Sequence, residues 1–211
     1  MSFHSEVLTA RQKKVLMQIG HFCTSREFYL AGGTALAIHL GHRRSGDFDW
    51  FTRHSIPHPL LLAEDIRKAN IPFITTHIER GTLYGTISGA RVSFIEYSYP
   101  LLEPCEIWSE YDCPLAHPSD IACMKLSAIT QRGSKKDFLD IYALASKVIP
   151  LDHMLKLYQN KFSVQDIGHV LFALAYFDDA DRERIPPLLW AVTWKAVREA
   201  IAQWVKALAI L

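Results

Sequence analysis

The most constraining feature of the chain is a short apolar run that ends in two adjacent glycines. Residues 28–31 (Phe-Tyr-Leu-Ala) predict a buried strand, and Gly32 and Gly33 predict a tight turn at its end. Neither glycine has a Cβ, so the backbone can approach a ligand closely at this turn. A short helix is expected next, with Thr34 as its cap and residues 35–40 as its body. The free N–H groups and the dipole at the start of such a helix favour a bound phosphate.

A second strand, predicted at 48–51, carries acidic side chains among aromatic ones. Asp47 and Asp49 are two residues apart, so both carboxylates are expected on the same face of this strand. Two neighbouring carboxylates repel each other unless cations lie between them. Mg²⁺ suits such a pair, because it binds one or two carboxylates together with substrate phosphates and water. The alternative is an ordinary strand with exposed aspartates, but Asp is disfavoured in strands and the aromatic neighbours indicate burial.

The remaining pattern divides the chain into a mixed part at 1–115 and a helical part at 116–211, which we expect to share one core and the active-site cleft. The predicted elements are helices at 7–24 and 59–69, β-rich runs at 72–78, 82–88 and 91–97 with a hairpin turn at Ser88-Gly89, an irregular proline-containing stretch at 100–114, helices at 120–130 (capped by Ser119) and 134–147, and only helices after Pro150. In the last helix, Trp190, Trp194 and Trp204 recur at helical spacing, which is typical of core packing.

Composition excludes several classes of protein. The 211 residues are 49% hydrophobic and carry 23 Lys and Arg against 22 Asp and Glu, so the chain is neither disordered nor strongly basic overall. A nucleic-acid partner would therefore need a local basic patch. No apolar stretch is long enough to span a membrane and the first residues contain no signal-peptide core, so we expect a cytoplasmic protein with reduced cysteines.

Two other chemistries are poorly supported. A zinc site built from Cys105, Cys113 and His117 lacks the close paired spacing that zinc sites usually have. The histidines form no HExxH motif and no Ser/His/Asp order that would indicate a hydrolase.

Two strings of the sequence, in the right order, resemble a known family. They are GGTALAIHLGHRRSGDFDWF at 32–51 and DIACMKLSAITQRGSKKDFLDIY at 120–142. Together they are similar to the AbiEii/AbiGii type of nucleotidyltransferase toxin, within the polymerase-β-like nucleotidyltransferase superfamily. The resemblance covers about 28–145 and implies an α+β fold, in which a small mixed β-sheet flanked by helices precedes a C-terminal helical bundle.

The resemblance also implies roles for matching residues. Gly32, Gly33 and Thr34 would hold the triphosphate of a nucleotide, with Arg44 and Ser45 beside them. The implied catalytic residues, of which the first two would bind Mg²⁺, are Asp47, Asp49, Lys125 and Asp137. Lys125 would neutralise phosphate charge, and Asp137 would complete the acidic site or help to activate the acceptor.

One departure from the family pattern concerns a third carboxylate, which polymerase-like sites commonly take from a neighbouring strand. In the run 91–97 that position holds Ser93, and the only acid, Glu96, is expected on the opposite face. Either Glu96 is unrelated to the site, or Asp137 supplies the missing charge, or activity is reduced.

Several residues of the second string also have plain structural interpretations. Lys125 on a helix could be a solvated side chain, and Asp137 and Asp140 could form a salt-bridged surface. If the two strings meet in space, a basic patch for an RNA backbone is expected from Arg43, Arg44, Arg132, Lys135 and Lys136. A merely solubilising surface is the alternative.

The leading hypothesis is a Mg²⁺-dependent nucleotidyltransferase that transfers a nucleotide from a nucleoside triphosphate to an acceptor such as tRNA. As a toxin of a toxin–antitoxin or phage-defence system, it would have a cognate antitoxin. The alternatives are a catalytically degenerate relative that only binds nucleotide, and a small-molecule nucleotidyltransferase of the antibiotic-modifying kind. No membrane partner is expected.

Overall fold

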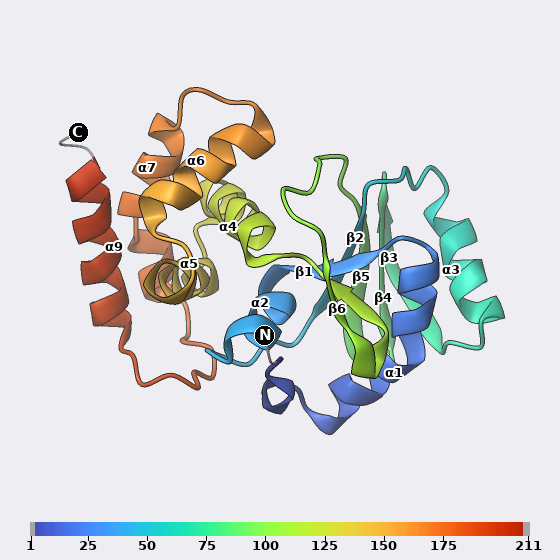
Figure 1. Ribbon diagram of the computed structural model, residues 1–211. Coiled ribbons are helices and arrows are strands. Elements are labelled where there is room, and N and C mark those ends of the chain that lie inside the picture. The colour runs from blue at the N-terminus through green and yellow to red at the C-terminus, as the bar shows by residue number, and fades with distance from the viewer. Residues whose placement is uncertain (1–2, 209–211) are drawn as a thin grey trace.

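The computed structural model describes residues 3–208, in which a seven-stranded mixed sheet precedes a group of helices (Figure 1). The strands are β1 (Tyr29–Ala31), β2 (Phe48–Thr52), β3 (Phe73–Glu79), β4 (Thr82–Ile87), β5 (Ala90–Glu96), β6 (Glu106–Trp108) and β7 (Cys113–Leu115). The α-helices are α1 (Ala10–Ser25), α2 (Gly32–Leu40), α3 (Pro59–Lys68), α4 (Pro118–Arg132), α5 (Lys135–Lys147), α6 (Leu151–Phe162), α7 (Gly168–Ala175), α8 (Asp178–Arg182) and α9 (Trp194–Leu208). The predicted α+β class is confirmed.

The order of the strands places the glycine turn and the aspartates in the middle of the sheet. That order is β3-β4-β5-β2-β1-β7-β6, with β2 parallel to β5 and antiparallel to β1. In this register Asp49 lies opposite Ala31 on one side and Ser93 on the other. The chain therefore leaves β1 at Gly32 directly beside the carboxylate of Asp49.

The two faces of the sheet differ in burial. Trp50, Phe94 and Leu83 lie side by side on β2, β5 and β4, and all are fully buried on the side where α1 and α3 pack (Figure 1). On the other face, the corresponding row is Asp49, Ser93 and Tyr84. This second face is the one that points toward α4. The alternation along each strand thus separates a closed apolar face from an open polar one.

The helices after residue 116 are joined to the sheet through α2. This helix packs against β1 and β2 and also against α4 and α5, so it lies between the sheet and the helical part (Figure 1). Residues 187–189, which precede α9, also pair with the loop after α2. The Arg44 N–H donates to the Pro187 carbonyl (2.9 Å), and the Leu189 N–H donates to the His42 carbonyl (2.9 Å).

Within residues 3–208, none of the helices has the length and apolar character needed to cross a membrane.

Several predicted boundaries were wrong because local hydrogen bonds override the apolar pattern. The helix expected at 7–24 is split: Ser5–Val7 form a 3₁₀ turn, and Thr9 starts α1 through a capping box with Gln12. His117, not Ser119, caps α4, because its ring nitrogen accepts the N–H of Ser119.

Two further differences concern the second half of the chain. The stretch at 100–114, predicted as irregular, contains β6 and most of β7, which are only three residues long. Trp190 lies outside the last helix, which begins at Trp194, and its ring packs edge-on against His42 with 5.8 Å between centroids.

Helix α1 packs closely against the 3₁₀ turn at Ser109–Tyr111. A Cβ added at Gly20 would lie 1.8 Å from the Tyr111 carbonyl oxygen, which is backbone and cannot move freely. We expect Gly20→Ala to lower the free energy of unfolding by about 2 kcal/mol or more, because overpacking outweighs the gain in helix propensity. Urea denaturation measures the change.

Gly46→Ala is the matched control, since a Cβ at that position meets no atom within 4 Å. Equal stability of the two variants would contradict the close packing of α1 on this turn.

Candidate active site

The open face of the sheet and helix α4 enclose a cleft of about 520 Å³. Its lining residues come from the glycine turn, the loop after α2, the open sheet face, the facing side of α4 and the start of α5: Gly32, Gly33, Arg43, Ser45, Asp47, Asp49, Phe51, Tyr84, Ser93, Ile95, Tyr97, Met124, Lys125, Ser127, Ala128, Gln131, Arg132 and Lys136. The two sequence strings singled out above therefore meet across this cleft.

Asp47 and Asp49 lie at the start of β2, and each carboxylate has one side-chain partner. Asp49 Oδ1 accepts a hydrogen bond from Ser93 Oγ (2.5 Å), and Asp47 Oδ1 accepts one from Arg91 Nε (2.6 Å). Gly32 is required beside them, because its φ is +68° and a Cβ there would lie 3.1 Å from Asp49 Oδ2. The turn thus brings backbone directly against a carboxylate.

The second glycine of the turn lies against a cation. A Cβ at Gly33 would be 2.6 Å from Arg43 Nη2 and 3.3 Å from Ser45 Oγ. The start of α2 therefore faces a guanidinium and a hydroxyl. Helix dipole, backbone N–H groups and these side chains together favour a bound anion.

Two residues predicted at the phosphate site, Thr34 and Arg44, do not line the cleft. Thr34 does not cap α2, because the helix begins at Gly32 and the Thr34 hydroxyl donates to the Asp47 carbonyl. It thereby fixes the loop that leads into β2. Arg44 is exposed and does not line the cleft; its backbone pairs with Pro187, and the preceding Arg43 points inward instead.

Arg43 is held in place by Asp140, one of two carboxylates buried beneath the cleft. Its Nε and Nη2 donate to the two oxygens of Asp140, each at 2.7 Å, in the bidentate geometry that makes such pairs strong. Lys125 Nζ lies 2.6 Å from Asp140 Oδ2, and His42 Nε2 lies 2.8 Å from Oδ1. Asp140 is fully buried.

The second buried carboxylate, Asp137, fixes two cations of α4. Lys125 Nζ donates to it at 3.0 Å, and Arg132 donates through Nε (2.7 Å) and Nη2 (3.0 Å). Ser134 Oγ adds a fourth donor at 2.7 Å. Asp137 does not line the cleft, so the structure does not bring it to Asp47 and Asp49. Its place in this structure is that of a buried counter-ion.

We refer to Arg43, Lys125, Arg132, Asp137 and Asp140 as the buried charge cluster, after its two fully buried carboxylates; of its members only Arg132 is exposed to solvent. Its three cations outnumber its two carboxylates, and all three cations line the cleft while neither carboxylate does. The cluster therefore presents net positive charge to the cleft, opposite Asp47 and Asp49. Such a surface is complementary to a polyphosphate.

The pKa values in the cluster follow from these contacts. Burial opposes ionisation of Asp137, but hydrogen bonds from Arg132 and Ser134 and the charges of Lys125 and Arg132 outweigh it and lower the pKa of Asp137 to about 2. Burial likewise opposes ionisation of Asp140, yet the charges of Lys125 and Arg43 hold its pKa well below the usual range. Both groups are carboxylates at neutral pH.

Two other residues considered from sequence lie outside the cleft. Glu96 accepts the Ile56 N–H at 2.8 Å and does not line the cleft, which leaves Ser93 as the residue beside Asp49. Lys135, expected in a basic patch, is buried; its Nζ donates to the Glu183 carbonyl and lies over the Trp194 ring.

From the sequence, Arg43 and Arg132 are expected only in a basic patch for an RNA backbone, and Asp140 only in a salt-bridged surface. The three-residue spacing of Asp137 and Asp140 was the available signal, because it places both carboxylates on one face at the start of α5. What the sequence alone does not reveal is that this face is turned inward.

The donor set of the cleft fits a divalent cation that also binds substrate. In residues 3–208 there is no group of three or more His, Cys, Asp or Glu side chains that could hold a metal by themselves. Asp47 and Asp49 supply two carboxylates beside an anion-binding turn, which matches the way Mg²⁺ is held by few protein ligands and by phosphate. The role of both residues as metal ligands stays a prediction.

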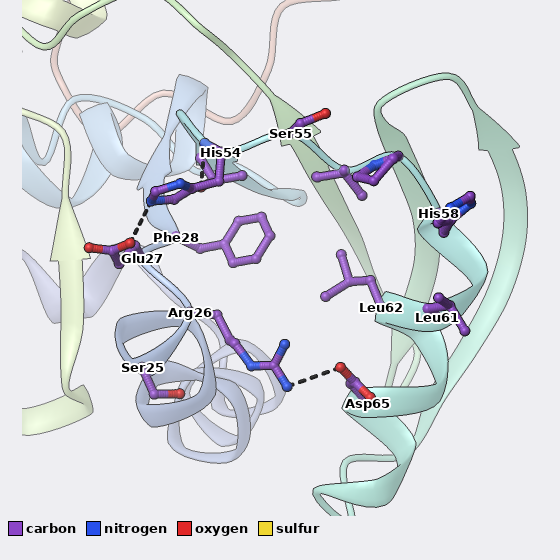
Figure 2. A pocket seen from close by; sticks show the side chains of 13 residues that line it. Ser25, Arg26, Glu27, Phe28, His54, Ser55, His58, Leu61, Leu62 and Asp65 are labelled. Atoms are coloured by element: carbon purple, nitrogen blue, oxygen red, sulfur yellow. Dashed lines mark hydrogen bonds and ion pairs between the residues drawn. The ribbon is translucent and has the colours of Figure 1, made fainter.

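A second pocket, of about 470 Å³, lies at the opposite ends of β1 and β2 (Figure 2). Figure 2 shows Phe28 and Leu62 inside it and two ion pairs at its sides, Arg26 with Asp65 (3.0 Å) and His54 with Glu27 (2.5 Å). Each of its two carboxylates, Glu27 and Asp65, thus has a side-chain partner, and none of the predicted site residues lines the pocket. The cleft beside α4 is therefore the candidate active site.

Comparison with known proteins agrees with this geometry. The sequence profile of the family described as "Nucleotidyl transferase AbiEii toxin, Type IV TA system" matches residues 16–207. The chain belongs to this family. It is 37% identical over 202 residues to the uncharacterized protein aq_aa25 of Aquifex aeolicus (strain VF5), covering 94% of this chain and 96% of that protein.

Solved structures show the same fold at low identity. JHP933 from Helicobacter pylori superposes with a TM-score of 0.57 at 12% identity, covering 98% of this chain and 93% of that one. The nucleotidyltransferase toxin MenT4 from Mycobacterium tuberculosis H37Rv superposes with a TM-score of 0.54 at 16% identity, covering 92% and 81%. The AbiEii family and the nucleotidyltransferase fold predicted from the sequence are confirmed.

The buried charge cluster predicts a defined pH dependence of stability. At pH 7 we expect Asp137→Asn to lower the free energy of unfolding by about 3 kcal/mol, because Arg132 and Lys125 lose a buried partner. The carboxyl has an ordinary pKa of 3.8 and a folded-state pKa of about 2. Its contribution is therefore fully present above pH 4 and is lost as the pH falls toward 2.

Urea denaturation of wild type and Asp137→Asn at several pH values measures this contribution. The difference between them should be constant from pH 7 to pH 5 and shrink by up to about 2 kcal/mol on approaching pH 2. Asp152→Asn, at an exposed position on α6, is the control. A difference that does not change with pH would show that the charge of Asp137 is not what stabilises the fold.

Proposed function

We propose that this chain is a Mg²⁺-dependent nucleotidyltransferase that transfers a nucleotide from a nucleoside triphosphate to a hydroxyl of RNA, with a tRNA end as the acceptor. The observation that carries the proposal is the meeting of Asp47 and Asp49 with the Gly32-Gly33 turn in one cleft, opposite a positively charged wall. Membership of a nucleotidyltransferase family supports the reaction type.

The reaction is an in-line displacement at the α-phosphorus. The acceptor oxygen forms a bond to phosphorus and gives up its proton, while the bond to the bridging oxygen breaks and pyrophosphate leaves. Such reactions depend mainly on positioning and on stabilisation of developing negative charge. When bound by Asp47 and Asp49, Mg²⁺ supplies positive charge next to the reacting phosphate.

The chain's own residues divide this work between two sides of the cleft. The N–H groups at the start of α2 and the Ser45 hydroxyl are placed to donate to phosphate oxygens. Arg43 and Arg132 are fixed by buried carboxylates and face the charge of the leaving pyrophosphate. Lys125 shares its charge with two carboxylates, so its direct share in phosphate binding is smaller than that of the two arginines.

The mouth of the cleft supports RNA as the acceptor. The side chain of Arg132 is 54% exposed, Lys136 is also exposed, and both residues line the cleft. These cations can contact a phosphodiester backbone while its terminal hydroxyl enters the cleft. As a family of toxins, AbiEii proteins imply an antitoxin, and we include a cognate antitoxin and cytoplasmic action in the proposal.

One observation favours a second candidate function. Ser93 occupies the place beside Asp49 where a third carboxylate would stand, and its hydroxyl donates to Asp49. A relative that binds nucleotide without transferring it would need no such carboxylate. The test below separates the two candidates.

The direct test compares wild type with an Asp47→Asn/Asp49→Asn double variant in the presence of Mg²⁺, each labelled nucleoside triphosphate and total tRNA. We expect label to enter RNA with wild type and to fall by at least about a hundredfold with the double variant, because the metal ligands are lost. Asp152→Asn/Asp179→Asn removes two exposed helical carboxylates and is expected to leave transfer unchanged.

Other outcomes would reject the RNA proposal in distinct ways. Nucleotide binding with no transfer to any acceptor would favour the second candidate. Label on a small hydroxyl compound would identify a small-molecule nucleotidyltransferase. Growth arrest on expression, absent with the double variant, tests the toxin role separately.

A further inference from the structure

Arg91 differs from the other cations around the cleft. It projects from β5, in the strand next to β2, and its Nε donates to Asp47 Oδ1 at 2.6 Å. Its side chain is 77% exposed, whereas Arg43 and Lys125 are 3% and 5% exposed and are each held by a fully buried carboxylate. Arg91 is thus attached to the site through a single, solvent-accessible ion pair.

The partner of Arg91 is the carboxylate that a divalent cation would use. The arginine on Asp47 Oδ1 offsets one of the two negative charges of the aspartate pair, while Asp49 has only the neutral Ser93 as its side-chain partner. A guanidinium and a divalent cation at this oxygen repel each other, so they compete for the carboxylate of Asp47. Because exposed ion pairs are weak, the arginine can be displaced at small cost.

Displacement would leave the guanidinium beside the phosphate site. Asp47 adjoins the turn that faces phosphate, and a guanidinium forms a bidentate pair with phosphate oxygens as well as with a carboxylate. The same side chain can therefore oppose a free cation and favour a cation that arrives together with a triphosphate.

We propose that Arg91 is an exchangeable counter-ion of Asp47, which weakens binding of free divalent cation and strengthens binding of the cation–triphosphate complex. The inference rests on the proposed function, because it takes Asp47 as a metal ligand. In this role, Arg91 allows tight binding of the divalent cation only when the nucleoside triphosphate is bound as well. Arg91 is thus a positioning residue for the divalent cation and the triphosphate.

Arg91 is expected to lower the affinity for the free cation and to raise the affinity for the cation–triphosphate complex. A purely structural role would not change the two affinities in opposite directions. Arg91→Gln keeps a hydrogen-bonding side chain but removes the charge. For Mn²⁺ alone, we expect the variant to have a Kd about fivefold lower than wild type, since the competing cation is gone. For Mn²⁺ with a non-hydrolysable nucleoside triphosphate analogue, we expect the Kd of the analogue to be about fivefold higher.

Mn²⁺ binding is measured by the electron paramagnetic resonance signal of the free ion, and analogue binding by calorimetry at saturating Mn²⁺. Arg80→Gln, an exposed arginine in the turn between β3 and β4, is the control and should change neither value. Thermal unfolding checks that all variants are folded. Unchanged or weaker Mn²⁺ binding by Arg91→Gln would overturn the inference, as would tighter binding of the analogue.

Asp47→Asn separates this inference from the proposed function. Loss of Mn²⁺ binding in that variant, together with unaltered Mn²⁺ affinity in Arg91→Gln, would reject the counter-ion role and keep the metal site. If Asp47→Asn binds Mn²⁺ as well as wild type does, or if neither wild type nor Arg91→Gln binds it, the metal site itself is rejected and the inference falls with it.

Discussion

The structure depends on two carboxylates buried where α5 meets α4 and the loop after α2. Asp137 and Asp140, on the first turns of α5, hold cations from α4 and from the loop after α2. Removing ionised groups from water is costly, and the cost is offset only when opposite charges and hydrogen bonds surround them. The contacts that meet this requirement are also those that turn Arg43, Lys125 and Arg132 toward the cleft. Stability of the fold and shape of the site are therefore set by the same ion pairs.

Much of the central sheet and of the cleft could be predicted from local sequence. The Gly32-Gly33 turn and the spacing of Asp47 and Asp49 constrain backbone geometry by themselves, and the structure places all four residues in one cleft. The hairpin at Ser88-Gly89 was predictable for a similar reason, since both residues adopt the positive φ that such turns require. These features are determined by residues that are close together in the sequence.

The features that escaped prediction depend on distant parts of the chain. Arg43 and Arg44 are adjacent and chemically identical, and only the position of Asp140, almost a hundred residues later, decides which one points into the cleft. The short strands β6 and β7 form because β7 pairs with β1 through Leu30 and Leu115, and no local periodicity in three residues reveals this. Thr34 likewise is of a residue type that often caps helices, but its hydroxyl donates a hydrogen bond to the Asp47 carbonyl.

The backbone pairing of the loop after α2 with residues 187–189 also bears on how the molecule folds. Strands β1 and β2 are complete once the first quarter of the chain has been made, yet Arg44 and His42 acquire these partners only when the segment before α9 has emerged from the ribosome. Synthesis of the strands and backbone pairing of the loop after α2 are thus separated in time. A growing chain would therefore contain all seven strands, which end at Leu115, well before the loop after α2 could pair with residues 187–189.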